Sequence, residues 1–99
     1  MRDQQKRRFD AVKQTLILSK EEVKELNQSE WGNHFLLIGY KIAYSFAYRG
    51  QSYEKQEYIY FRTLTKAERK KLRDLEVGDD VQVLFQKQNP KASRIDFQA

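Results

Sequence analysis

The chain has 99 residues, which fits one domain, and its 39% hydrophobic and 13% aromatic content allows a modest core. The absence of cysteine excludes a disulfide framework and a thiolate metal site, and no apolar run reaches the roughly 18–20 residues that cross a bilayer. A net charge of +5 favours anionic partners, namely nucleic acid, an acidic membrane surface or an acidic protein.

The first third of the chain predicts a basic segment, a strand and a short helix. Residues 1–8 are rich in Arg and Lys and lack the apolar region of a signal peptide, so we expect a loose basic arm on a cytoplasmic protein. Residues 9–18 predict a strand. Ser19 followed by Glu22 has the form of a capping box, which predicts a helix to about Asn27. Residues 28–33 are expected to be a connection, with Gly32-Asn33 as a stop signal.

The stretch 35–62 predicts two long strands that form a hairpin. Apolar residues take every second position from Tyr40 to Tyr48, which is typical of a half-buried strand. The turn has two interpretations: Arg49-Gly50 as the central pair of a type I′ turn, or Gly50-Gln51 as that of a type II′ turn. In either case Tyr40 and its even-numbered neighbours share a face with odd-numbered residues of the second strand. A three-residue loop would shift this pairing, but a two-residue turn is favoured because it brings the apolar residues of both strands to one face.

The opposite face of this hairpin carries Tyr58 and Tyr60 beside small residues such as Ala43 and Ala47. One interpretation is a surface packed against a helix or a barrel wall. The alternative is a platform on which nucleic-acid bases stack, where each aromatic contact contributes about 1–3 kcal/mol.

The last third of the chain predicts a basic helix and two strands. Thr65 and Glu68 form a second capping box, and the helix that it opens runs to about Leu75. Residues 81–86 and a short segment around residues 95–97 predict strands. The fold class is therefore mostly β (α+β), with about five antiparallel strands in a curved sheet or small barrel and two short helices. Residues 9–99 form a single β-rich domain after the arm.

One order of motifs resembles an uncharacterised bacterial domain family. It runs Tyr-x-Phe-x-Tyr-x-Gly-x-x-Tyr over residues 44–53, a short helix, Val-Gly-Asp-x-Val-x-Val over residues 77–83, and Asn-Pro-x-x-Ser over residues 89–93. That family, of unknown function, is typically found beside transmembrane helices. The resemblance implies a structural domain that is associated with a membrane protein, through a partner or through a segment outside these 99 residues. It supplies no catalytic residues.

Catalysis and metal binding have little support in the sequence. His34 is the only histidine and has no cysteine to partner it, and its place before an apolar run is typical of a strand start. The carboxylates at residues 74–80 lack the alternating spacing of a calcium loop, and no glycine-rich phosphate cradle occurs. We therefore predict a non-enzymatic chain without a cofactor or a metal.

The basic helix gives the functional hypothesis. Residues 62–73 hold six basic side chains and one acidic side chain, a local charge of +5. The sequence predicts a non-catalytic binding or interaction module, and an alternative is a small β-barrel that binds RNA or single-stranded nucleic acid. An acidic protein surface is the other candidate partner, and a free hairpin edge allows a homodimer. The candidate binding residues are Arg62, Lys66, Arg69, Lys70, Arg73, Tyr58 and Tyr60.

Overall fold

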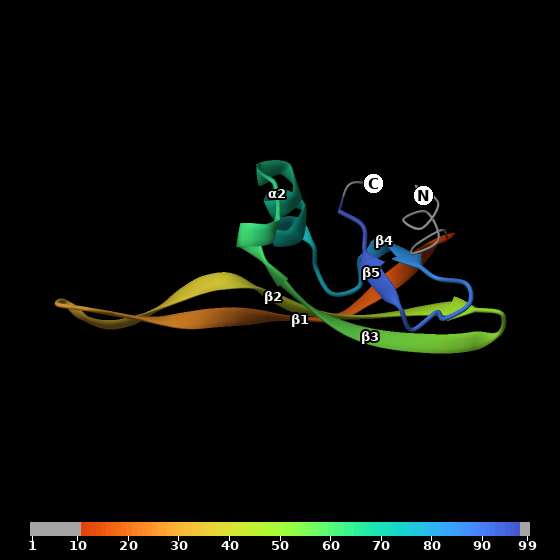
Figure 1. Cartoon of the computed structure of the whole chain (residues 1–99), viewed down its shortest axis with the longest axis horizontal. Coiled ribbons are helices and arrows are strands. Elements are labelled where there is room, and N and C mark those ends of the chain that lie inside the picture. The colour runs from red at the N-terminus through yellow and green to blue at the C-terminus, as the bar shows by residue number, and fades with distance from the viewer. Residues whose placement is uncertain (1–10, 98–99) are drawn as a thin grey trace, which may run out of the picture.

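A computed structural model describes residues 11–97, and its elements follow one another in Figure 1. The strands are β1 (Ala11–Ser29), β2 (Gly32–Tyr48), β3 (Gln51–Tyr60), β4 (Asp80–Phe85) and β5 (Ser93–Ile95). A 3-10 turn, η1 (Phe61–Thr63), and one α-helix, α2 (Lys66–Asp74), lie between β3 and β4. The predicted basic arm at residues 1–8 lies outside the described residues.

All five strands belong to one antiparallel sheet with the order β3-β2-β1-β4-β5. The mostly β architecture predicted from the sequence is confirmed. The prediction of two helices was slightly wrong, because the described residues contain one α-helix and a single 3-10 turn. Within residues 11–97, no helix is long and apolar enough to cross a membrane.

The turn between β2 and β3 is centred on Arg49-Gly50, the first of the two predicted alternatives. Arg49 has φ +54° and Gly50 has φ +78°, the two positive values that a type I′ turn requires. Tyr48 pairs with Gln51, and the register brings Phe46 opposite Tyr53. The even-numbered residues of β2 thus share one face with the odd-numbered residues of β3, as the alternation predicted.

The core lies on that face, and α2 covers part of it. Tyr44 and Ile42 of β2 are fully buried, and Leu72 of α2 reaches the same cluster because it faces inward from the helix. Phe46 packs between the rings of Tyr53 and Phe85, with centroid distances of 5.5 and 5.3 Å. The buried apolar cluster comprises Ile17, Ile42, Tyr44, Phe46, Ile59, Leu72, Leu75, Val83, Phe85 and Ile95.

The sheet is open and is not a barrel, so that alternative was wrong. Its edges are β3 and β5, and side chains rather than a strand ladder connect them. The backbone N–H of Ile95 donates to the Glu57 carboxylate over 2.9 Å, and the Lys55 ammonium donates to the carbonyl of Ser93. Strands β3 and β5 are therefore close in space although they lie at opposite ends of the sheet order, which requires a strongly curved sheet.

The predicted helix at residues 19–27 was also wrong, because this segment continues β1 as a strand. It pairs residue by residue with β2, from Ser19 opposite Ala43 to Ser29 opposite Gly32. A capping box stabilises a helix only locally, whereas this ladder satisfies the backbone groups of the whole segment. The connection predicted at residues 28–33 narrows to a turn at residues 30–31.

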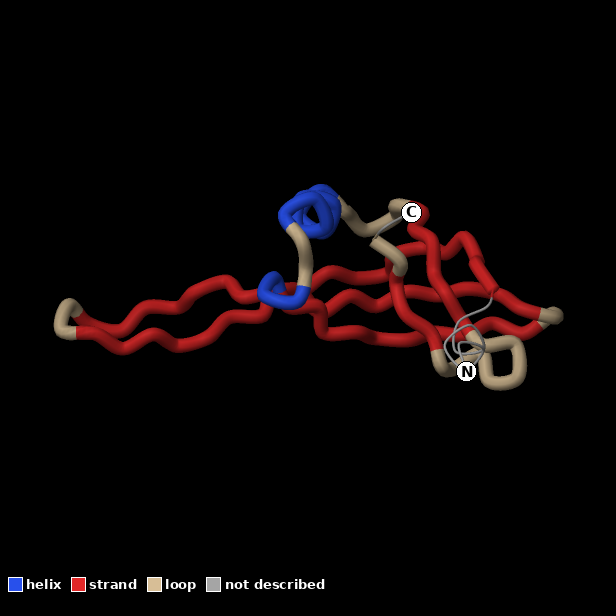
Figure 2. The backbone as a smooth tube through the Cα atoms, turned by 45° about the horizontal axis from the view of Figure 1, so that its top comes forward, coloured by secondary structure: helices blue, strands red, loops and turns tan. Residues whose placement is uncertain are grey.

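This extension produces the most unusual part of the shape, a two-stranded ribbon that leaves the body of the protein (Figures 1 and 2). We call residues 21–38 the projecting hairpin. Strand β3 joins β2 only from Gly39 onward, and β4 joins β1 only up to Leu16. The longest extent of the molecule is 54 Å against 35 and 21 Å in the other directions.

Candidate functional site

Helix α2 begins at the predicted capping box. The Thr65 hydroxyl accepts from the Glu68 backbone N–H at 3.2 Å, and the Glu68 carboxylate accepts from the Thr65 N–H at 2.9 Å. Leu72 of α2 and Leu75, directly after the helix, are buried against the sheet. The helix therefore holds its basic side chains at a fixed place on the core face of the sheet.

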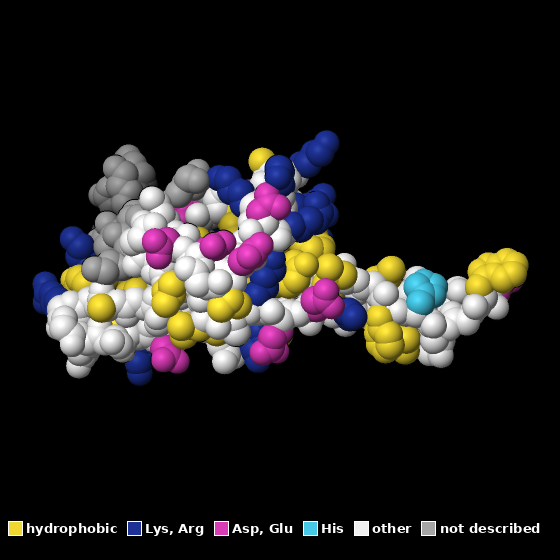
Figure 3. All heavy atoms as spheres, turned by 180° about the vertical axis from the view of Figure 1, so that it is seen from behind, with side chains coloured by type: hydrophobic (Ala, Val, Ile, Leu, Met, Phe, Trp, Pro, Cys, Tyr) yellow, Lys and Arg dark blue, Asp and Glu magenta, His cyan; other side chains and the backbone are white. Residues whose placement is uncertain are grey.

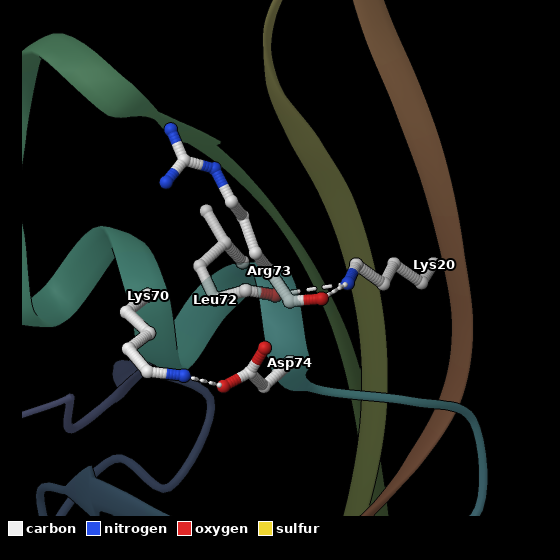
Figure 4. A network of polar contacts seen from close by, with 5 residues as sticks. All are labelled: Lys20, Lys70, Leu72, Arg73 and Asp74. Carbon is white, nitrogen blue, oxygen red and sulfur yellow. Dashed lines mark hydrogen bonds and ion pairs between the residues drawn. The ribbon is translucent and has the colours of Figure 1, made fainter.

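Lys20 of β1 fixes the other end of α2 (Figure 4). Its ammonium donates to the carbonyl oxygens of Leu72, Arg73 and Leu75 at 2.9, 3.0 and 2.7 Å. A cation at these carbonyls caps the helix and complements the negative end of its dipole. Partial burial lowers the pKa of Lys20, which nearby acidic side chains oppose. The sequence analysis missed this contact, because it placed Lys20 in a helix of its own.

Three of the predicted basic residues on α2 already contact other groups of the chain. The Arg69 Nε donates to the carbonyl of Phe61 over 2.9 Å, and the Arg73 guanidinium lies 5.2 Å from the centre of the Phe61 ring. Lys70 forms an ion pair with Asp74 at 2.7 Å, which lowers the pKa of that carboxyl. Figure 4 shows Lys70 and Arg73 pointing to different sides of α2. Lys66 is exposed in the first turn.

The other predicted residues form a column of rings and cations on β3 and its neighbours. The rings of Tyr58 and Tyr60 are stacked with an interplanar angle of 15° and centroids 6.5 Å apart. The Arg62 guanidinium lies 5.0 Å from the Tyr60 centroid, and the Lys41 ammonium lies 5.7 Å from the Tyr58 centroid. We call Lys41, Tyr58, Tyr60 and Arg62 the stacked column. Lys41 is a member that the sequence analysis did not select, although it pairs directly with Tyr58 across the strands.

The stacked column and α2 do not form one surface. Ile59 lies in the core that α2 covers, so Tyr58 and Tyr60, which flank Ile59 in β3, point to the opposite face of the sheet. The seven predicted residues therefore divide into two groups. Arg62, Tyr58 and Tyr60 belong to the stacked column, whereas Lys66, Arg69, Lys70 and Arg73 belong to α2. The sequence could not reveal this division, because it depends on where the helix packs.

A buried polar network lies at the gap between β3 and β5, and sequence analysis did not identify it. The Tyr44 hydroxyl donates to the Glu57 carboxylate at 2.6 Å and contacts the Ser93 hydroxyl at 2.9 Å. Burial raises the pKa of Glu57, and burial together with the Glu57 charge raises the pKa of Tyr44. Tyr44 therefore stays protonated and can donate. These contacts join the two sheet edges, which is a structural role.

Glu57 also lines a groove of about 540 Å³ between β3, η1 and the last residues of the chain. The groove wall includes Arg94 and Asp96, so its charges are mixed. His34 lies away from it on the projecting hairpin, where its ring is 3.1 Å from the Asn27 amide. Among residues 11–97, no group of three or more acidic or histidine side chains is arranged to hold a metal ion.

Comparisons with family models, curated proteins and solved structures returned no match to this chain. The resemblance to a bacterial domain family stays a prediction. Arguments about function therefore rest on the two surfaces described above.

Proposed function

We propose that this chain is a non-catalytic binding module that engages single-stranded RNA or DNA through the stacked column. The observation that supports this best is the pair of parallel tyrosine rings with a cation at each end. Tyr58 remains 57% exposed although it is a large ring in the interior of a strand. Rings of this kind accept bases by stacking without sequence preference.

The charges of the stacked column suit the same ligand. The Lys41 ammonium lies over the Tyr58 ring and the Arg62 guanidinium lies over the Tyr60 ring, so a base that stacks on either ring has a cation next to it that can contact its phosphate. Arg62 also lies on the ring of Tyr60, and an arginine in this position adds a cation–π contribution to base stacking. The net charge of +5 supports association with a polyanion.

A titration with labelled oligonucleotides tests the proposal. Fluorescence anisotropy with a 20-nucleotide uridine RNA and its DNA counterpart, at 50 and 200 mM KCl, should give saturable binding that weakens with salt. Tyr58→Ala removes one stacking contact, so we expect about a tenfold loss of affinity, equivalent to roughly 1.4 kcal/mol. Arg62→Glu should weaken binding and reduce the salt dependence.

Two further variants locate the contact surface. Lys87→Glu changes the total charge as Arg62→Glu does, but in the exposed loop between β4 and β5, so it should have the smaller effect. Lys70→Glu changes the outer side of α2. If Lys70→Glu abolishes binding while Tyr58→Ala does not, then α2 and not the stacked column contacts the ligand. No binding by the folded protein at 50 mM KCl would reject nucleic acid, and the acidic protein surface would then be tested as the partner.

A further inference from the structure

Among residues 11–97, no other segment pairs with the edges of the projecting hairpin, and most of its side chains are exposed on both faces. An isolated two-stranded ribbon is only marginally stable in water, so this hairpin is expected to need a surface to pack on. Its exposed apolar side chains support the same conclusion. Figure 3 shows hydrophobic side chains along the hairpin and at its tip. The exposed large ones are Leu26, Trp31, Phe35, Leu36 and Leu37.

Three of these residues share one face, and that face continues the core side of the sheet. Lys20 of β1 points toward α2, and Leu26 lies on the same face of the strand because it follows Lys20 by an even number of residues. An irregularity in β2 at Ile38 shifts the pairing, so Leu37 lies opposite Lys24 and Phe35 lies opposite Leu26. The face ends at the base of the hairpin beside Tyr40.

At that base the face meets α2 and forms an aromatic and cationic corner. The rings of Tyr40 and Phe61 meet edge to face with centroids 5.9 Å apart, and both are only partly buried. The Arg73 guanidinium lies over the Phe61 ring. We call Tyr40, Phe61 and Arg73 the hairpin corner. It suits an aromatic side chain that is accompanied by a negative charge.

The tip of the hairpin has that chemistry. Trp31 is 93% exposed at the turn, and Glu30 precedes it. The whole projecting hairpin carries four glutamates and one lysine, a net charge of −3 with His34 neutral. Residues 62–73 carry +5. The tip of the hairpin is thus complementary to the α2 region of its own chain type. On the face between tip and base, the charges of Glu22 and Lys24 cancel because the two side chains form an ion pair at 3.3 Å. An anionic lipid surface or a nucleic acid would repel the hairpin.

We propose that the occupant of the hairpin face is a second copy of this chain, in a two-fold dimer. The two hairpins pack antiparallel to each other, through the face that carries Leu26, Phe35 and Leu37. By symmetry, the tip of each hairpin then reaches the base of the other, where Trp31 enters the hairpin corner of the second copy and Glu30 approaches its Arg73. The tip of a hairpin cannot fold back to its own base, so these contacts require two copies.

The size of the interface explains why the tips must take part. Nine residues per strand make the hairpin about 30 Å long, and its face is about 10 Å wide. Hairpin against hairpin therefore covers roughly 300 Å² per copy, which is less than the about 1,000 Å² in total that a specific interface needs. Two tip-to-corner contacts, each burying a tryptophan, supply the remaining area.

Trp31 reports on this dimer directly because it is the only tryptophan. Analytical ultracentrifugation over a concentration series should show a monomer–dimer equilibrium. The Trp31 emission maximum should shift to the blue over the same concentrations, because the ring leaves water for the hairpin corner. The oligonucleotide titration uses another surface, so either result can fail without the other.

Two leucines of equal exposure provide a matched pair of variants. Leu26 is 46% exposed on the proposed contact face, and Leu36 is 48% exposed on the opposite face. Leu26→Ser should raise the dimer dissociation constant at least tenfold, whereas Leu36→Ser should change it less than threefold. Far-UV circular dichroism checks that both variants fold. Equal effects of the two variants would overturn the proposed face.

Charge reversal tests the tip contact. Glu30→Lys and Arg73→Glu should each weaken the dimer, and the double variant should recover affinity because the pair is then restored with opposite signs.

A protein that stays monomeric at 0.5 mM in 50 mM salt would refute the proposal. So would a blue shift of Trp31 that occurs only when vesicles of phosphatidylcholine or phosphatidylglycerol are added, which would assign the hairpin to a lipid surface.

Discussion

The Tyr44 hydroxyl connects three strands, so its removal is a sharp test of how the curved sheet is held together. It donates to Glu57 of β3 at 2.6 Å and contacts the Ser93 hydroxyl of β5 at 2.9 Å. Tyr44→Phe keeps the ring in the core but deletes both contacts. Glu57 then retains the Ile95 N–H at 2.9 Å, whereas Ser93, only 4% exposed, loses this partner for its hydroxyl.

The expected cost follows from these contacts. A hydrogen bond to a charged group contributes about 1.5–3 kcal/mol, and a buried hydroxyl without its partner costs about 1–3 kcal/mol. Because the Ser93 hydroxyl can rotate, we expect both contributions to lie near the low end of these ranges. Tyr44→Phe should therefore lower the free energy of unfolding by about 2–4 kcal/mol at pH 7. For a domain of this size each kcal/mol lowers the melting temperature by about 4–8 °C.

Urea unfolding followed by far-UV circular dichroism measures this loss. Tryptophan fluorescence is unsuitable, because Trp31 is already exposed in the folded chain. Tyr48→Phe is the matched control: Tyr48 packs edge-on against Phe85 with centroids 4.9 Å apart, and its hydroxyl forms no hydrogen bond within residues 11–97. The control should cost less than about 0.5 kcal/mol. If Tyr44→Phe costs no more than the control, then the network does not hold the sheet edges together.

Three further predictions concern stability. Because the pKa of Glu57 is raised in the folded protein, its contribution to stability is complete below the ordinary carboxyl pKa and is lost as pH rises through the folded value. The free energy of unfolding of the native chain, minus that of Glu57→Gln, should therefore fall between pH 3.5 and 7.5, and a flat difference would contradict the raised pKa. Lys20→Met removes three hydrogen bonds to the end of α2 and should cost about 1–3 kcal/mol in thermal unfolding. Lys87→Met, at an exposed site in the loop between β4 and β5, should cost less than about 0.5 kcal/mol. Gly39→Ala would place its Cβ against the carbonyl oxygen of Ile59, a backbone atom that cannot move aside, so urea unfolding should show a loss of about 1–3 kcal/mol, and native stability would refute this close approach.

The sequence alone determined the elements that depend on neighbouring residues. Alternation over residues 40–48 predicted β2, and Gly50 predicted a tight turn after it. The type of that turn, I′ or II′, was left open by the sequence and was decided by the positive φ of both Arg49 and Gly50. The Thr65 capping box predicted where α2 begins for the same local reason. Alternation also placed Tyr58 and Tyr60 of the stacked column on one face, whereas Arg62 was selected as part of the basic cluster at residues 62–73.

The tertiary structure decided what depends on distant partners. Ser19 and Glu22 have the local pattern of a helix start, but the ladder with β2 made them part of a strand. Lys20 caps a helix 52 to 55 residues away, and Glu57 meets β5 only because the sheet curves. The division of the basic and tyrosine residues between two faces has the same origin. These features depend on where separate elements pack, and periodicity along the chain carries no information about that placement.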